Sequence, residues 1–344
     1  MDLSGAYSAM GGDLAGAFSL VLISLAGLIM VVWDSFRNND RMIPWFGVAA
    51  CAAAVMFELV KINAGSEAVF YRLMWTGGFA SFVNVVILVG AALTIVLSVP
   101  YLKRTGHDHG EVYALLMFAS AGMMLLGTAN NLITVFVGLE TMSICLYILT
   151  GLMRKEAGAT ESALKYFLLG AFSTGFFLYG IALLYAATGT MYLDQMGASL
   201  GASGGNVLFW AGVALLMIGF LFKVSAVPFH MWTPDVYQGA PTTLTGYMST
   251  ASKASAFAAL ILVLFHSLPA ERWSMVLALV AVLTMVLGNL AAIAQTNVKR
   301  MLAYSSIAHA GYILVGLASG TVAGYSGALF YLLVYSLMNI GAFG

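Results

Sequence analysis

Apolar stretches of about 20 residues recur along the whole chain and are separated by short polar connections. A stretch of this length crosses the hydrocarbon core of a bilayer as a helix. A transmembrane β-strand would alternate in polarity over about ten residues, whereas these stretches are continuously apolar. The pattern predicts an all-α polytopic membrane protein with eleven spans, at about 14–33, 42–60, 80–101, 112–128, 130–153, 162–187, 206–237, 241–266, 273–296, 299–319 and 323–344.

The seventh stretch, 206–237, is too long for one straight crossing and too short for two. It contains Pro228 and Pro234. Because proline removes a backbone donor and clashes with the preceding turn, we expect the helix to break near 225–229. A broken helix at membrane depth is tolerated where it lines a polar cavity or is buried in protein. A structural proline kink is the alternative, but Lys223 and His230 flank the break and favour a functional role.

Composition narrows the class of protein further. Hydrophobic residues make up 61% of the chain, charged residues 8%, and the net charge is zero. A soluble domain carries about 25% charged residues, so a water-soluble enzyme, a disordered chain and a nucleic-acid-binding protein with a basic surface are excluded. Cys51 and Cys145 lie in apolar runs without metal-ligand spacing, and we expect both to be buried packing residues.

Basic residues are distributed unevenly between the connections. The odd-numbered connections carry eight and the even-numbered ones carry three. Because Lys and Arg favour the cytoplasmic side of short loops, we expect the odd connections in the cytoplasm and the N-terminus outside. The odd set is Arg37, Arg41, Lys103, Arg104, Arg154, Lys155, Lys299 and Arg300, and the even set is Lys61, Arg72 and Arg272.

Four charged residues inside the predicted spans stand out, namely Glu140, Lys165, Lys223 and Lys253. A charged side chain at mid-bilayer costs about 2.5–3.5 kcal/mol even on the most lenient scale, so each needs a reason. Three structural explanations stay open. Lys165 could reach the surface and pair with Glu161 one turn earlier, Glu140 and Lys253 could form a static pair, and Lys223 could bind carbonyls freed by the break.

The functional hypothesis is a proton relay. Burial lowers the pKa of a lysine from about 10.4, so that a buried lysine can load and release a proton. A carboxylate about 5 Å away, at an effective dielectric of about 20, attracts the ammonium by about 3 kcal/mol. Making or breaking such a contact would switch the lysine between its two protonation states.

Histidines and acidic residues elsewhere complete the set of candidates. His230 and His309 titrate near neutrality and are candidate links of the relay, although hydrogen-bonded core histidines are equally common. We expect no metal site and no nucleotide, flavin, haem or iron–sulfur motif. Glu58 is expected to be a surface charge beside Lys61, and Asp235 is expected to cap the emerging half of the broken helix.

Four segments resemble one known family. The segment 222–254, FKVSAVPFHMWTPDVYQGAPTTLTGYMSTASKA, is similar to the subunit N family of bacterial NADH-quinone oxidoreductase, respiratory complex I. Further similarity lies in 137–149, 161–185 and 297–314. The string PDVYQGAP at 234–241 resembles subunit N, rather than subunits L and M or the cation/proton antiporters.

The resemblance implies an antiporter-like fold of inverted five-helix repeats, each with a discontinuous helix. Residues 111–267 would form the first repeat, after three N-terminal helices in 1–110 and before an incomplete second repeat in 268–344. Family members continue for about three more helices, and the last span here ends at Gly344 without a polar terminus, so we expect the chain to be truncated. The proton path implied by the family falls on Glu140, Lys165, Lys223, Lys253 and His309.

The resemblance also implies which activities belong to this chain and which belong to partner subunits. The chain would be a non-redox subunit of a proton-translocating oxidoreductase in the bacterial inner membrane. It would hold no cofactor, since NADH, FMN, iron–sulfur clusters and quinone belong to partner subunits. Its own partners would be the lipid bilayer and other membrane subunits, with quinone only indirectly involved. A stand-alone cation/proton antiporter and a purely structural scaffold are the alternatives.

Overall fold

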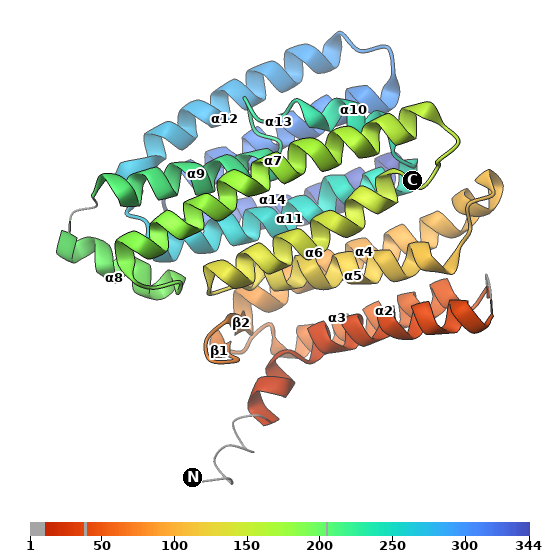
Figure 1. The fold of residues 1–344 in the computed structure, drawn as a ribbon, viewed down its shortest axis with the longest axis horizontal. Coiled ribbons are helices and arrows are strands. Elements are labelled where there is room, and N and C mark those ends of the chain that lie inside the picture. The colour runs from red at the N-terminus through yellow and green to blue at the C-terminus, as the bar shows by residue number, and fades with distance from the viewer. Residues whose placement is uncertain (1–10, 38–39, 204–205) are drawn as a thin grey trace.

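The computed structural model describes residues 11–37, 40–203 and 206–344. Ten helices within these residues are long and apolar enough to cross a membrane, and their axes run side by side (Figure 1). They are α2 (Phe18–Phe36), α3 (Ile43–Lys61), α4 (Gly78–Thr105), α5 (Gly110–Gly127), α6 (Leu132–Thr150), α7 (Ala157–Thr188), α11 (Thr242–Ser267), α12 (Ala270–Ile293), α13 (Val298–Ala318) and α14 (Val322–Phe343).

The remaining predicted span is the broken one. Helix α9 (Val207–Lys223) ends at Lys223, and α10 (Trp232–Gly239) begins at Trp232, with the eight non-helical residues 224–231 between them. The Trp232 indole Nε1 donates to the carbonyl oxygen of Phe222 at 3.0 Å, which supplies one partner to the interrupted backbone. The break predicted near 225–229 is confirmed, and it leaves Lys223 at the last position of α9.

Three short elements, two strands and a helix, were not predicted, and all three belong to connections rather than spans. Strands β1 (Glu67–Val69) and β2 (Met74–Thr76) form an antiparallel hairpin between α3 and α4. Helix α8 (Leu193–Ser203) lies between α7 and α9. The hairpin and α8 lie at the same end of the bundle (Figure 1), called the hairpin end below.

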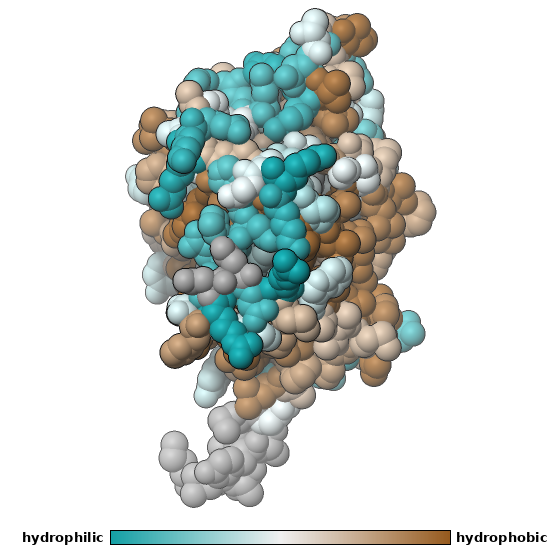
Figure 2. Space-filling view, turned by 90° about the vertical axis from the view of Figure 1, so that its right-hand side faces the viewer, coloured by the Kyte–Doolittle hydropathy of each residue, from teal (hydrophilic) through white to brown (hydrophobic). Residues whose placement is uncertain are grey.

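The opposite end of the bundle carries the exposed Arg41, Lys103 and Arg154, and is called the basic end below. Figure 2 looks onto this end and shows a hydrophilic face flanked by hydrophobic sides. The sides expose large apolar residues, for example Phe172 on α7 and Val286 on α12. This distribution is that of a bundle whose sides face hydrocarbon and whose ends face water.

Helix α11 forms the core of the bundle. Nearly all its residues are buried, and it packs against α4, α5 and α14. Cys51 and Cys145 are buried and free, as predicted. Because α11 carries Lys253 in its middle, the fold itself places an ammonium group in the most enclosed part of the protein.

Candidate functional site

Lys223 lies in a pocket of hydroxyl groups between α6, α7 and α9. Its side chain is 3% exposed, and its Nζ donates to the Ser143 hydroxyl at 2.9 Å and to the Tyr166 hydroxyl at 3.3 Å. The expected alternative, in which Lys223 binds carbonyls freed by the break, is wrong, because both hydrogen-bond partners are side-chain hydroxyls. The described residues provide no carboxylate within ion-pair distance of this ammonium.

Glu140 lies on α6, one turn before Ser143, and its side chain is half-buried. Its Oε1 accepts a hydrogen bond from the Thr174 hydroxyl at 2.8 Å. Thr174, Ser143 and Lys223 line one small cavity of about 10 Å³, close to the minimum for a single water. Thr174 thus binds Glu140 and also lines the cavity beside Lys223, so one hydroxyl links the two sites, and the described residues form no direct Glu140–Lys223 ion pair.

Lys253 is the second fully buried lysine. It is 1% exposed, and its Nζ donates to the carbonyl oxygen of Ser306 at 2.8 Å and to the Ser306 hydroxyl at 2.7 Å. The static Glu140–Lys253 pair is thus not formed. The same Ser306 hydroxyl accepts from the Tyr335 hydroxyl at 2.7 Å, and Tyr335 in turn accepts from the Asn339 amide at 2.9 Å.

His309 lies beside this polar chain. Its ring centroid is 4.9 Å from that of Tyr335, and its Nδ1 is 2.5 Å from the Tyr331 hydroxyl. The structure therefore brings Lys253, Ser306, Tyr335 and His309 together from α11, α13 and α14.

His230 follows the break and is placed differently. Its Nδ1 is buried and has no hydrogen-bond partner of good geometry in the part of the chain that the structure describes. The Tyr237 hydroxyl, on the neighbouring helix α10, shares this property. Buried polar atoms of this kind are normally paired with ordered water.

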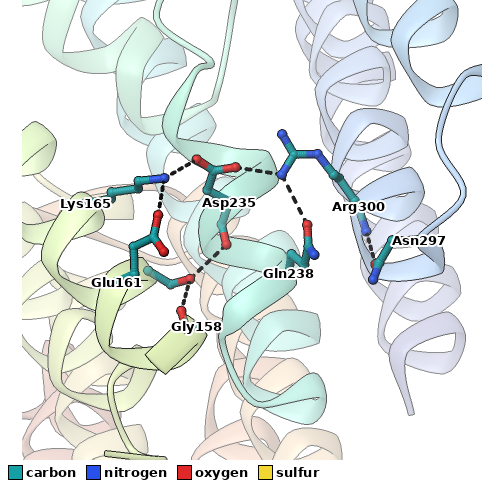
Figure 3. A network of polar contacts seen from close by, with 8 residues as sticks. Gly158, Glu161, Lys165, Asp235, Gln238, Asn297 and Arg300 are labelled. Carbon is teal, nitrogen blue, oxygen red and sulfur yellow. Dashed lines mark hydrogen bonds and ion pairs between the residues drawn. The ribbon is translucent and has the colours of Figure 1, made fainter. Parts of the chain in front are cut away.

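Lys165 is not brought to the Lys223 site. It is 41% exposed at the basic end, where its Nζ contacts Glu161 Oε1 and Asp235 Oδ2, each at 2.7 Å (Figure 3). The expected pair with Glu161 is therefore present. Asp235 also pairs with Arg300 at 2.6 Å. These residues line a polar cavity of about 390 Å³ together with Lys299.

Two expectations about acidic residues are wrong. Asp235 is not a helix cap, because the N-cap of α10 is Met231 and no side chain caps it. Glu58 is not a surface charge. It is 3% exposed, and its carboxylate accepts from the Ser81 hydroxyl at 2.6 Å and the Asn84 amide at 3.1 Å.

The chain is similar to known membrane proteins over most of its length. Residues 129–344 match the family model described as NADH:quinone oxidoreductase/Mrp antiporter, TM. NADH-quinone oxidoreductase subunit N of Salinibacter ruber is 62% identical over this whole chain, which covers 69% of that relative. The chain belongs to the NADH-quinone oxidoreductase subunit N family.

Solved structures agree with this membership. A chain of respiratory complex I from Thermus thermophilus superposes with a TM-score of 0.81 at 36% identity, covering 94% of this chain and 69% of that one. A chain of the Mrp complex from Dietzia sp. DQ12-45-1b superposes with a TM-score of 0.85 at 20% identity, covering 96% and 64%. The Mrp likeness shows the fold alone. The predicted antiporter-like, multi-pass helical architecture of this subunit N family member is confirmed.

The sequence analysis did not predict which residues are the partners of the lysines in this subunit N family member. They are the hydroxyl partners of the two lysines and the partners of Lys165, namely Ser143, Tyr166, Ser306, Tyr335, Asp235 and Arg300. Neutral hydroxyls inside a span carry no cost that would single them out. Within the described ranges, no group of three or more His, Cys, Asp or Glu side chains is arranged to hold a metal ion.

Proposed function

We propose that this chain is a proton-translocating membrane subunit of bacterial NADH-quinone oxidoreductase, in which Lys223 and Lys253 take up and release protons. The observation that carries the proposal is that both ammonium groups are buried and held by neutral oxygen atoms alone. Burying an uncompensated charge is costly, and hydroxyl partners can serve a neutral amine as well as an ammonium. A lysine held in this way can change its protonation state without losing its partners.

Glu140 would set the charge state of Lys223. Its carboxylate binds Thr174, which lines the small cavity beside Lys223, and movement of Glu140 or Lys223 would change their attraction. At about 5 Å and an effective dielectric of about 20 this attraction is about 3 kcal/mol, comparable with the ~2.3 kcal/mol needed to move one charge through 100 mV. Lys165 would act at the basic end, where its contacts with Glu161 and Asp235 place it near water.

Proton transfer between the two buried lysines would run from Lys223 past His230 to Lys253. The Nδ1 of His230 and the hydroxyl of Tyr237 are buried and lack a hydrogen-bond partner of good geometry among the described residues, which supports a water chain in this region. Beyond Lys253, the hydrogen bonds through Ser306 and Tyr335 extend the path toward His309. We propose that protons move along this order of groups, with the odd-numbered connections on the cytoplasmic side of the inner membrane.

Electron transfer would belong to other subunits. We propose that this chain holds no redox cofactor, that NADH, FMN, iron–sulfur clusters and quinone are bound by its partners, and that it contacts neighbouring membrane subunits. The runner-up function is a stand-alone cation/proton antiporter. Sodium-dependent proton movement in vesicles containing only this subunit would favour that alternative.

The test is made in the assembled oxidoreductase. Lys223→Ala should slow proton pumping and the quinone reduction coupled to it by at least about tenfold, since a positioned proton carrier contributes about 10²–10⁴ in rate. Lys103→Ala removes an exposed lysine at the basic end and should have no effect. Lys223→Arg separates a relay from a scaffold, because arginine keeps its charge but does not release its proton. Normal pumping in Lys223→Arg would contradict the relay.

A further inference from the structure

We propose that Asp235 is a positioning residue, which holds helix α10 between the two buried lysine sites and so couples them. This inference rests on the proposed function. Asp235 lies in the first turn of α10 and receives a cation from each side (Figure 3). Lys165 of α7 contacts Oδ2 at 2.7 Å, and Arg300 of α13 contacts Oδ1 at 2.6 Å.

The two ion pairs of Asp235, with Lys165 and with Arg300, are called the clamp below, and other contacts strengthen both of its sides. On the α7 side, the Ser162 hydroxyl donates to the carbonyl oxygen of Asp235 at 2.9 Å. On the α13 side, Arg300 also donates to Gln238 at 3.1 Å, and Lys299 donates to the carbonyl oxygen of Ala240 at 2.5 Å. Ala240 is the C-cap of α10. One turn of α13 therefore binds both the Asp235 carboxylate and the C-terminal end of α10.

The first turn of α10 contacts the Lys223 site. Trp232 stacks on Tyr166 with ring centroids 4.6 Å apart and planes inclined by 8°. Tyr166 is fully buried, and its hydroxyl is one of the two partners of Lys223. The Trp232 indole also binds the carbonyl of Phe222, the residue before Lys223. A displacement of α10 therefore moves the surroundings of the Lys223 ammonium directly.

The second half of α10 faces the Lys253 site. Tyr237 is fully buried, and its hydroxyl lies near those of Ser306 and Tyr335, the chain that begins at Lys253. Its ring also packs edge-on against Trp232, with centroids 6.0 Å apart. One rigid helix of eight residues thus touches the partners of both lysines, and its two aromatic side chains touch each other.

The position of α10 depends on Asp235 because the helix is joined to the chain by non-helical segments at both ends. Without the carboxylate charge, Lys165 and Arg300 would face each other as like charges across α10 and push α7 and α13 apart. Trp232 and Tyr237 would then lose their fixed places at the two sites. The lysines would remain intact, but a change at one would no longer be transmitted to the other.

The test compares Asp235→Asn with Glu161→Gln in the assembled oxidoreductase. Both changes remove one carboxylate contact of Lys165, yet Glu161 lies on α7 and does not hold α10. We expect Asp235→Asn to raise the hydrogen-exchange rate of residues 232–239 about tenfold and to lower the protons moved per electron at least about twofold. Glu161→Gln should leave the exchange rate of residues 232–239 unchanged and lower pumping less than Asp235→Asn does, and Asp235→Glu should retain both quantities.

Assembly is controlled by normalising to the amount of intact complex. If Asp235→Asn does not assemble, Arg300→Gln removes one side of the clamp and should give the same two changes in weaker form. Unchanged exchange in residues 232–239, or equal pumping in Asp235→Asn and Glu161→Gln, would overturn the inference. If exchange rises while Lys223→Ala still pumps normally, α10 is positioned as proposed and the relay function is the part that fails.

Discussion

Lys253 of α11 donates two hydrogen bonds to Ser306 of α13, one to its carbonyl oxygen at 2.8 Å and one to its hydroxyl at 2.7 Å. The two acceptors differ in what a mutation can remove. The carbonyl persists in any variant, whereas the hydroxyl also accepts from Tyr335 and connects the ammonium to the polar groups of α14. Removing the hydroxyl therefore tests proton transfer from Lys253, because the hydrogen bond to the carbonyl still holds the side chain in place.

Ser306→Ala should retain a folded protein but weaken proton transfer. Lys253 keeps the carbonyl, while Tyr335 loses its acceptor, at a cost of about 1–3 kcal/mol for a buried donor left unpaired. We expect fewer protons moved per electron in the assembled oxidoreductase, measured by quenching of a pH-sensitive dye. Ser306→Thr should restore pumping, and Ser35→Ala, which removes an exposed hydroxyl on α2, serves as control. A normal ratio in Ser306→Ala would show that the hydroxyl is dispensable.

The positions of the spans, of the break and of the buried lysines could be predicted from the sequence. Hydropathy located all the spans within a few residues, and Pro228 with Pro234 located the break. The cost of charge in hydrocarbon identified Lys223 and Lys253, which are both buried. These inferences succeed because burial in a membrane depends first on position along the chain, which the sequence gives directly.

The partner of a side chain was not predictable in the same way. Asp235 and Arg300 are 65 residues apart, and neither residue type nor spacing shows that α10 and α13 face each other. Lys165 has one partner four residues away, which periodicity found, and a second 70 residues away, which it could not find. Long-range pairs depend on the rotation and packing of helices, which are properties of the folded bundle.

Glu58 shows why a position near the end of a helix did not predict exposure to water. It lies three residues before the end of α3, a position that normally reaches water. The hairpin folds over this end instead, so that Lys61 contacts Thr76 of β2. Helix α4 then runs beside α3 and presents Ser81 and Asn84, one turn apart, to the carboxylate. The hairpin and α4, which pack over this end of α3, bury the Glu58 carboxylate.

Glu58→Ala should destabilise the N-terminal helices. The Ser81 hydroxyl and Asn84 amide would lose their acceptor, at a cost of about 1–3 kcal/mol. We expect a lower midpoint of thermal unfolding for the assembled oxidoreductase. Glu58→Gln should be milder, because its amide oxygen can still accept one of the two hydrogen bonds. Glu67→Ala, on the exposed side of β1, is the matched control, and an equal loss in both alanine variants would contradict the assignment.

The close approach of α7 and α9 provides the third prediction. A Cβ atom on Gly180 of α7 would lie 2.6 Å from the backbone nitrogen of Leu216 on α9, whereas a Cβ on Gly175 would meet nothing within 4 Å. Membrane helices rely on small residues at such contacts, and overpacking a well-packed interface costs about 1–3 kcal/mol. Gly180→Ala should therefore lower the unfolding midpoint, while Gly175→Ala should be neutral or stabilise by about 0.5–1 kcal/mol.

The same pair of variants tests the Lys223 site. Tyr166 is on α7 and Lys223 ends α9, so separating these helices should lengthen the hydrogen bond between them. We expect Gly180→Ala, but not Gly175→Ala, to reduce the protons moved per electron in intact oxidoreductase. Because neither glycine carries a polar side chain, such a loss can only arise from geometry. Equal pumping in both variants, alongside a lowered unfolding midpoint in Gly180→Ala alone, would show that the Tyr166–Lys223 contact tolerates displacement.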